Sequence, residues 1–468
     1  MNDRPKVVIA GATGFVGSHL ARRLRDRFHV VGLSRSAPKG HTAAVADEWR
    51  SADLFSLKDA EAALAGVQIA YYLVHSMMPS ARLTQGAFEN LDLIAADNFA
   101  RAAAKAGVKQ IIYLGGLIPE GEELSLHLRS RLEVEQTLGA RGVPLTALRA
   151  GIVIGKQGSS FQVLYRLVSR LPLMFCPKWT LTKTHPIYLG DMVELLSYCA
   201  GRTTTYGQQY DVGGPDVLTY RGLIAMLARL MGVKRVLLHV PLFSPGLSRL
   251  WVTLITGAPR ALVAPLVQSL RHEMVAKDTR LQIEAGIPGV GMEEALRLAL
   301  RETETTASKK PAAFSRGAPP KRRSEVRSVQ RLPKPVSMTA KEVGEAYLAW
   351  LPHRFFPLRV KVAGPRAEFY LRFLPFPLLV LNYSQERSCD ERSLFYIVGG
   401  ILAYPEGRGR LEFRTSWNGE FLLAAIHEYL PRLPWRVYTL TQAKVHLYVM
   451  WRFGRYLASI PARSLRHR

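Results

Sequence analysis

The sequence predicts an α/β protein, a doubly wound parallel sheet with a small second lobe, followed by a separate α+β domain. Three observations support this fold class. Short apolar runs alternate with amphipathic stretches through the first half, a glycine-rich turn follows the first run, and a basic, proline-rich stretch divides the chain. Buried parallel strands joined by helical crossovers give such an alternation. A chain of 468 residues is also too long for one ordinary core.

The apolar runs and the stretches between them set the order of elements in the first half. Residues 15–27 place apolar side chains at positions 16, 20 and 24, the spacing of one helix face. The runs on either side are short and continuous, as in strands covered on both faces. We expect strands at residues 6–11, 29–35, 69–76, 109–116 and 144–155, and helices at 15–27, 56–66 and 88–107.

The basic stretch sets the domain boundaries. Between Ser308 and Lys341 there are ten Lys/Arg, one Glu and five prolines. Such a segment cannot bury enough apolar area to offset its chain entropy, so it predicts a flexible linker. We expect a first domain at residues 1–302, a linker at 303–340 and a C-terminal α+β domain at 341–468.

The net charge of +26 has two interpretations. In the first, the arginine excess is general and the linker is only a solvated connection. In the second, the linker binds an anionic membrane or a nucleic acid by electrostatic attraction. No reading helix or aromatic–basic platform is visible, so nucleic-acid binding is not expected.

The three widely spaced cysteines favour a reducing, cytoplasmic compartment, with peripheral membrane association as the variant that the charge allows. The N-terminus enters a strand at once, which leaves no room for a signal peptide. No run reaches about 18 uninterrupted apolar residues, so no spanning helix is expected.

The stretch "GATGFVG" carries the strongest chemical signal. It places Gly11, Gly14 and Gly17 between the first strand and the first helix. Glycines there let the backbone turn tightly and approach a pyrophosphate, whose charge the helix N-terminus stabilises. The strand before and the helix after are the setting that the motif requires. The turn therefore predicts a dinucleotide site.

The end of the second strand indicates which dinucleotide. NAD-selective folds place Asp or Glu there to accept from the ribose 2′-hydroxyl. This chain has "GLSRS", with Ser34 and Arg35 at that place, and a guanidinium can pair with a 2′-phosphate. NADP is favoured, and NAD is the alternative. Asp53, after the third strand, is placed to reach the adenine edge.

Four stretches of the first half are similar to a known family. They are "GATGFVG", "SADLFSLKDAEAALAGVQIAYYLVHS", "AAKAGVKQIIYLGGL" and "VPLTALRAGIVIG". They resemble the short-chain dehydrogenase/reductase superfamily, and more narrowly its atypical, NmrA-like members, which include bacterial NAD(P)-binding proteins related to epimerases. The resemblance covers about residues 5–300 and implies a Rossmann-type fold. With the motifs above, it implies cofactor contacts from Gly11, Thr13, Gly14, Phe15, Val16, Gly17, Ser34, Arg35, Asp53, Leu54, Val74, His75, Leu114, Gly115 and Arg131.

The chain differs from this family at the positions of the catalytic residues. Ordinary members carry a serine after the fifth strand and Tyr-x-x-x-Lys on the next helix. This chain has Gly115-Gly116 in the first place and "HLRSR", with His127 and Arg131, in the second. The resemblance therefore implies cofactor binding without the usual proton relay.

Two places are alternatives for the missing acid. His127 titrates near neutrality and can serve if it faces the nicotinamide, although the nearby Arg131 disfavours its charged form. The alternative for His127 is a surface histidine on a repurposed helix. His75 and Ser76 end the fourth strand, at the crevice where such sheets bind ligands. Arg131 is expected to hold a ribose but cannot relay a proton.

The rest of the first domain predicts a substrate-side lobe at about residues 176–302. Arg149, His185 and Asp191 are expected at the rim of the same crevice. Residues 244–274 are unusually apolar, with arginines at intervals. Three arrangements of this stretch are open: it caps a lipophilic pocket, it lies on a membrane surface, or it forms a buried helix pair.

The last part predicts a helix at residues 340–351, six strands, and one long helix at 434–458. That order is similar to helix-grip domains, in which a curved sheet wraps the last helix around an apolar cavity. The polar residues Glu412, His427, Glu428 and His446 match no metal-ligand spacing, so no metal is expected.

Two functions remain open. The first is an NADP(H)-dependent oxidoreductase that acts on a small lipophilic molecule. The second is a non-catalytic protein that binds NADP(H) as a structural or sensing element and reports through its C-terminal domain. A nucleic-acid-binding regulator is a weaker third, supported only by the linker charge.

Overall fold

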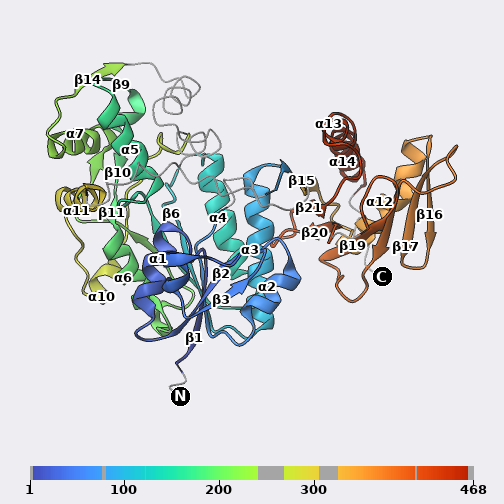
Figure 1. Cartoon of the computed structure of the whole chain (residues 1–468), viewed down its shortest axis with the longest axis horizontal. Coiled ribbons are helices and arrows are strands. Elements are labelled where there is room, and N and C mark those ends of the chain that lie inside the picture. The colour runs from blue at the N-terminus through green and yellow to red at the C-terminus, as the bar shows by residue number, and fades with distance from the viewer. Residues whose placement is uncertain are drawn as a thin grey trace. The chain divides into compact units, whose positions relative to one another are not determined.

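The structure is a computed structural model, and it describes residues 4–75, 81–121, 123–240, 268–304, 325–405 and 408–461. The chain forms two compact units (Figure 1). Unit 1 comprises Met1–Met78 and Asp92–Arg316, and unit 2 comprises Pro79–Leu91 and Gly317–Arg468.

The core of unit 1 is a parallel sheet, as predicted. In the part of the chain that the structure describes, seven strands lie in the order β12-β7-β6-β4-β1-β2-β3. The order reverses between β1 and β4, so a topological switch point lies there, and open α/β sheets bind ligands at such points. The strands are β1 (Lys6–Ala10), β2 (His29–Ser34), β3 (Glu48–Ser51), β4 (Ile69–Tyr72), β6 (Gln110–Gly116), β7 (Leu145–Ala150) and β12 (Gln209–Val212).

Helices cover both faces of this sheet. Alternate residues of β1 show why: Val7 and Ile9 pack with α1 and α6, whereas Val8 and Ala10 pack with α2, α3 and α4. Strands buried on both faces need continuous apolar runs, and the sequence has them. The helices are α1 (Phe15–Leu24), α2 (Leu57–Leu64), α3 (Phe88–Lys105), α4 (Leu126–Gly139) and α6 (Leu189–Cys199).

A smaller lobe has a core of its own in unit 1, where Phe161, Leu223 and Leu296 pack together. Because Phe161 lies on α5, the lobe includes residues before 176. Most of the apolar stretch predicted at 244–274 lies outside the described residues. The remaining elements of unit 1 are η1 (Gly40–Val45), β8 (Val153–Ile154), α5 (Ser159–Arg170), β9 (Leu173–Pro177), η2 (Lys178–Leu181), β10 (Lys183–Thr184), β11 (Ile187–Tyr188), η3 (Thr203–Thr205), β13 (Leu218–Thr219), α7 (Tyr220–Leu230), β14 (Val236–Val240), α10 (Arg280–Ala285) and α11 (Met292–Glu304).

Unit 2 is built on a mostly antiparallel sheet. Among the described residues its eight strands lie in the order β16-β17-β18-β19-β20-β21-β15-β5. The six strands predicted after residue 357 are all present. They are β16 (Leu358–Ala363), β17 (Arg366–Leu371), β18 (Leu379–Tyr383), β19 (Arg392–Gly399), β20 (Arg410–Thr415) and β21 (Phe421–Tyr429).

The other two strands correct the predicted boundaries. β15 (Val326–Pro333) lies within the predicted linker and pairs with β21 along its whole length. Its apolar residues Val326, Val329 and Leu332 stand three apart, with a register irregularity between Val326 and Ser328, so the sequence lacks the alternation that predicts a strand. β5 (Leu83–Gln85) comes from the first half of the chain and pairs with β15 in parallel. A three-residue strand carries no periodicity that a sequence can reveal.

The helices of unit 2 pack on this sheet. α12 (Ala340–Arg354) begins at a capping box formed by Thr339 and Glu342. The single helix predicted at 434–458 is two helices, α13 (Trp435–Leu440) and α14 (Gln442–Ala458). The break falls at Thr441, whose φ of −116° and ψ of −86° are not helical. In the part of the chain that is described, no helix is long and apolar enough to cross a membrane.

Candidate cofactor site

The turn after β1 has the geometry that its glycines predict. Gly11 has φ +98°, and a Cβ there would lie 2.8 Å from the carbonyl oxygen of Leu73. A Cβ on Gly17 would lie 2.2 Å from the carbonyl oxygen of Gly11, so only glycine lets α1 pack this closely on the turn. The Gly14 amide donates to the Gly11 carbonyl at 2.8 Å and closes the turn. The backbone alone therefore shapes this part of the site.

The N-terminus of α1 suits an anion. Gly14 is its N-cap, no side chain caps its first amides, and no acidic residue stands in its first turn. Such amides carry partial positive charge and bind phosphate groups. Thr13 and Gly14 are exposed, and Phe15 and Val16 are partly buried. The backbone of Thr13 and Gly14 is therefore accessible to an anion.

The end of β2 presents a cation. Arg35 is exposed directly after the strand, and the Ser34 hydroxyl donates to the Ser36 carbonyl at 2.7 Å. Asp53 shapes its own loop, because its Oδ1 accepts from the Phe55 amide at 3.2 Å. The carbonyl of the next residue, Leu54, accepts from the Asn98 side chain at 2.8 Å.

The predicted nicotinamide side is formed by neighbouring strand ends. In the register of the sheet, Ala10 pairs with Tyr72, and Tyr72 pairs with Tyr113. The residues that follow these strands share one edge of the sheet because the strands are parallel. They are Gly11 after β1, Leu73, Val74 and His75 after β4, and Leu114 and Gly115 within the end of β6. Ser76 lies outside the described residues.

Arg131 has a different role from the one predicted. Its side chain is 8% exposed and forms an ion pair with Asp92 on α3, which is 1% exposed. The Ser130 hydroxyl also donates to Asp92, at 3.3 Å. The Tyr113 hydroxyl donates to the Arg131 carbonyl at 3.2 Å. The expected ribose contact is not supported, because a buried guanidinium that already faces a carboxylate is not open to a ribose.

His75 and His127 come from different elements and interact electrostatically. The pKa of His127 is lowered to about 3, mainly by burial and also by the charges of Arg131 and His75. The His75 side chain is exposed, yet its pKa is lowered because neighbouring protein atoms shield the ring from water, and the charge of Arg131 adds to that effect. Both imidazoles are therefore neutral near pH 7, and neither holds a proton ready to donate as an imidazolium.

The three residues expected at the rim have structural partners. Arg149 donates to both carboxylate oxygens of Glu135, at 3.0 and 2.6 Å. His185 is buried, with Nε2 2.6 Å from the Gly214 carbonyl and Nδ1 accepting from the Ala276 amide at 3.2 Å. Asp191 accepts from the Val290 amide at 2.7 Å. The Arg149 contact joins β7 to α4, and the contacts of His185 and Asp191 join segments between residues 185 and 290.

Of the four polar residues weighed as metal ligands in unit 2, the two glutamates lie in ion pairs. Glu412 pairs with Arg392 and Arg414, each at 2.7 Å, and Glu428 pairs with Arg410 at 2.7 Å. Burial raises the pKa of Glu412, but the two guanidinium groups outweigh it and hold the pKa well below its usual range. Within the described ranges, no three His, Cys, Asp or Glu residues gather as a metal site.

The fold and the turn define a nucleotide-binding protein of the Rossmann type, and sequence comparison agrees. Residues 11–167 match a family described as NAD(P)H-binding. This part of the chain is therefore similar to NAD(P)H-binding domains.

Two relatives share part of this domain. An auxiliary protein, GraX, of Staphylococcus aureus is 32% identical over 142 residues, which are 30% of this chain and 43% of that protein. The chain thus spans less than half the length of that relative. Sanguinarine reductase of Eschscholzia californica is 25% identical over 199 residues, which are 34% of this chain and 73% of that enzyme.

Among solved structures, the triphenylmethane reductase of Citrobacter sp. complexed with NADP(H) has the same fold. The TM-score is 0.51 at 19% identity, and the match covers 63% of this chain and 99% of that one. This similarity supports the Rossmann-type fold of unit 1.

Proposed function

We propose that unit 1 is an NADPH-dependent reductase of electron-poor, conjugated, lipophilic molecules such as quinones. One observation carries this proposal. The helix that holds the family's proton donor here presents a neutral His127 and a buried Arg131–Asp92 pair, beside an intact cofactor turn.

The absence of an acid at this helix selects the type of acceptor. Bound NADPH supplies a hydride. Reduction of an isolated ketone creates an alkoxide, which needs a proton from a positioned acid in the transition state. His127, with a pKa of about 3, does not carry that proton near pH 7. A quinone spreads the incoming charge over its ring and takes its proton from water, so it needs no such acid.

The choice of NADPH rests on the second strand. Arg35 is exposed where the adenosine ribose is expected, and the strand end Leu33–Arg35 carries no carboxylate that would repel a 2′-phosphate. The reductase assignment is also favoured by the name of one relative, sanguinarine reductase, at 25% identity.

The test is NADPH oxidation by the full-length chain with menadione, a quinone, and with cyclohexanone, an isolated ketone. We expect turnover with menadione only. His127→Ala should keep the rate within about threefold, whereas loss of a true acid costs roughly 10²- to 10⁴-fold.

Turnover of cyclohexanone that disappears in His127→Ala would overturn the proposal and make His127 the acid. If NADPH binds but no acceptor in a wider quinone panel is reduced, the proposal fails in favour of a non-catalytic, cofactor-sensing protein. Ser76, predicted beside His75, enters this test as Ser76→Ala and His75→Ala, each assayed for turnover and for NADPH affinity.

A further inference from the structure

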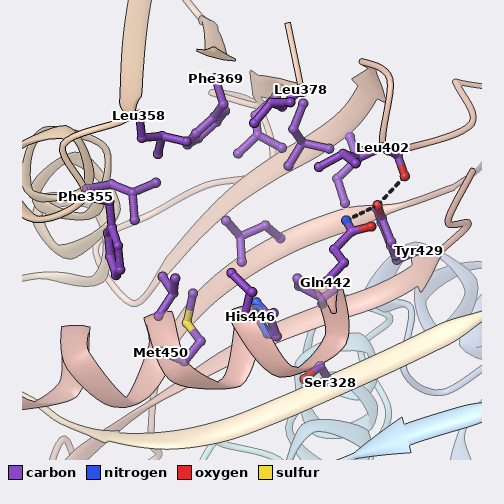
Figure 2. Close-up of a pocket in the computed structure, with 18 of the residues that line it drawn as sticks. Ser328, Phe355, Leu358, Phe369, Leu378, Leu402, Tyr429, Gln442, His446 and Met450 are labelled. Carbon is purple, nitrogen blue, oxygen red and sulfur yellow. Dashed lines mark hydrogen bonds between the residues drawn. The ribbon is translucent and has the colours of Figure 1, made fainter. Parts of the chain in front are cut away.

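Unit 2 contains a cavity that the cofactor site does not involve. It has a volume of about 340 Å³ and lies between the sheet and helices α12 and α14 (Figure 2). Pockets of roughly 300–1,000 Å³ bind drug-sized ligands. The strands contribute Phe369 and Leu381, and α14 contributes Gln442, His446 and Met450.

The lining excludes a charged occupant. Most of the side chains that line the cavity are aliphatic or aromatic, and in the described part of the chain none is Asp, Glu, Lys or Arg. A carboxylate or phosphate inside would lose its hydration with no countercharge to replace it. The cavity therefore fits an uncharged, largely hydrocarbon molecule.

One end of the cavity carries an amide whose orientation is fixed. The Tyr429 hydroxyl donates to the Leu402 carbonyl at 2.6 Å, so towards Gln442 it can only accept. The side-chain Nε2 of Gln442 donates to it, as Figure 2 shows. The Gln442 Oε1 is then the free end of the amide, and it is buried with no hydrogen-bond partner among the described residues.

A second polar atom lies one helical turn further along α14. The Nε2 of His446 is buried and, within the described ranges, has no hydrogen-bond partner. Burial lowers the pKa of His446 to about 4, so the ring is neutral near pH 7 and Nε2 can donate or accept, depending on its tautomer. Buried polar atoms in native proteins nearly always have a partner, so two that line one cavity indicate a ligand group or a water between them.

We propose that this cavity binds an uncharged lipophilic alcohol. The hydroxyl donates to Gln442 Oε1 and meets His446 Nε2, and the hydrocarbon lies along the apolar wall towards Phe355 and Phe369, which Figure 2 shows at the other end. Val445 lines the cavity and is also 58% exposed, so α14 borders its entrance. The proposal does not depend on the function proposed for unit 1.

The experiment uses the full-length chain and a neutral fluorescent probe, N-phenyl-1-naphthylamine, displaced by three competitors of one chain length. They are 1-dodecanol, 1-methoxydodecane, which has no hydroxyl hydrogen, and dodecanoate, which is charged. We expect 1-dodecanol to bind about tenfold more tightly than either, the size of one well-placed hydrogen bond. Gln442→Leu should remove the advantage of the alcohol over the ether and leave probe binding intact.

Two further variants locate the probe. Val449→Trp fills the cavity and should abolish probe binding, whereas Leu447→Trp, on an exposed part of the same helix, should not. Circular dichroism confirms that each variant is folded. Equal displacement by the alcohol and dodecanoate, or probe binding that survives in a folded Val449→Trp, would overturn the proposal.

Discussion

The cofactor turn of unit 1 is shaped by backbone atoms, whereas the cavity of unit 2 is shaped by side chains. The turn is made of backbone, and a single added Cβ at Gly17 would lie 2.2 Å from a carbonyl oxygen. The cavity is made of side chains from many elements, and its shape changes whenever one of them changes. The turn therefore tolerates almost no substitution at its glycines, whereas the cavity is shaped by side chains that also belong to the core of unit 2.

The surroundings of the two sites also differ in whether their buried polar groups have partners. Unit 1 buries a charge together with its countercharge, Arg131 with Asp92. The cavity in unit 2 buries neutral groups, Gln442 and His446, and leaves one atom of each without a partner among the described residues. A matched ion pair contributes to structure, and unmatched neutral groups are available to a ligand.

The largest effect should come from breaking the ion pair. Arg131→Met leaves the Asp92 carboxylate buried without this cation, which should destabilise unit 1 by about 3–5 kcal/mol. Urea unfolding monitored in unit 1 measures it. The matched control is Arg129→Met on the same helix, where the pair with Glu123 is exposed and a change within about 0.5 kcal/mol is expected.

The double variant Arg131→Met/Asp92→Leu removes both charges and should recover a substantial part of this loss. If Arg131→Met is as stable as Arg129→Met but weakens NADPH binding, the guanidinium contacts the ribose after all.

The next effect tests the exposed cation of unit 1. Arg35→Ala should weaken NADPH binding by about 10- to 150-fold, or 1.5–3 kcal/mol, by removing a charge-assisted contact with the 2′-phosphate. NADH affinity should stay nearly unchanged. Fluorescence titration of both cofactors measures this, with Arg22→Ala as a control for loss of a positive charge elsewhere in the unit. Equal wild-type affinities for NADPH and NADH would contradict the assignment.

The same contrast explains what the sequence could predict. The glycine turn was predictable because its backbone geometry demands one residue type at fixed spacing. The Arg131–Asp92 pair was not, because Asp92 lies on α3 and Arg131 on α4 and no local pattern joins them. Six strands of unit 2 were predicted from their strand-like runs, but the role of Gln442 depends on Tyr429 and Leu402, which only the fold brings together.

The smallest effect concerns His446 of unit 2, whose side chain is half-buried. The pKa of His446 in the folded chain is about 4, below its ordinary value of 6.5. Between these values the unfolded chain takes up a proton that the folded chain does not, so stability falls as the pH drops through this window. His446→Leu should reduce that loss by about 1 kcal/mol, because the side chain is partly exposed. Thermal unfolding at pH 7 and pH 4.5 measures it, and an identical loss in both proteins would contradict the assignment.

The pairing of β5 with β15 has a consequence for synthesis on the ribosome. Leu83 emerges 243 residues before its partner Val326. At about 5–20 residues per second, β5 waits roughly 10–50 s for the strand that it joins. Unit 1 can complete most of its sheet in that time, whereas the sheet of unit 2 cannot be completed until β21, at residues 421–429, has emerged. A slowly translated or truncated message would therefore release chains whose β5 has no strand to join, and chaperones that recognise unpaired strand edges should bind them first.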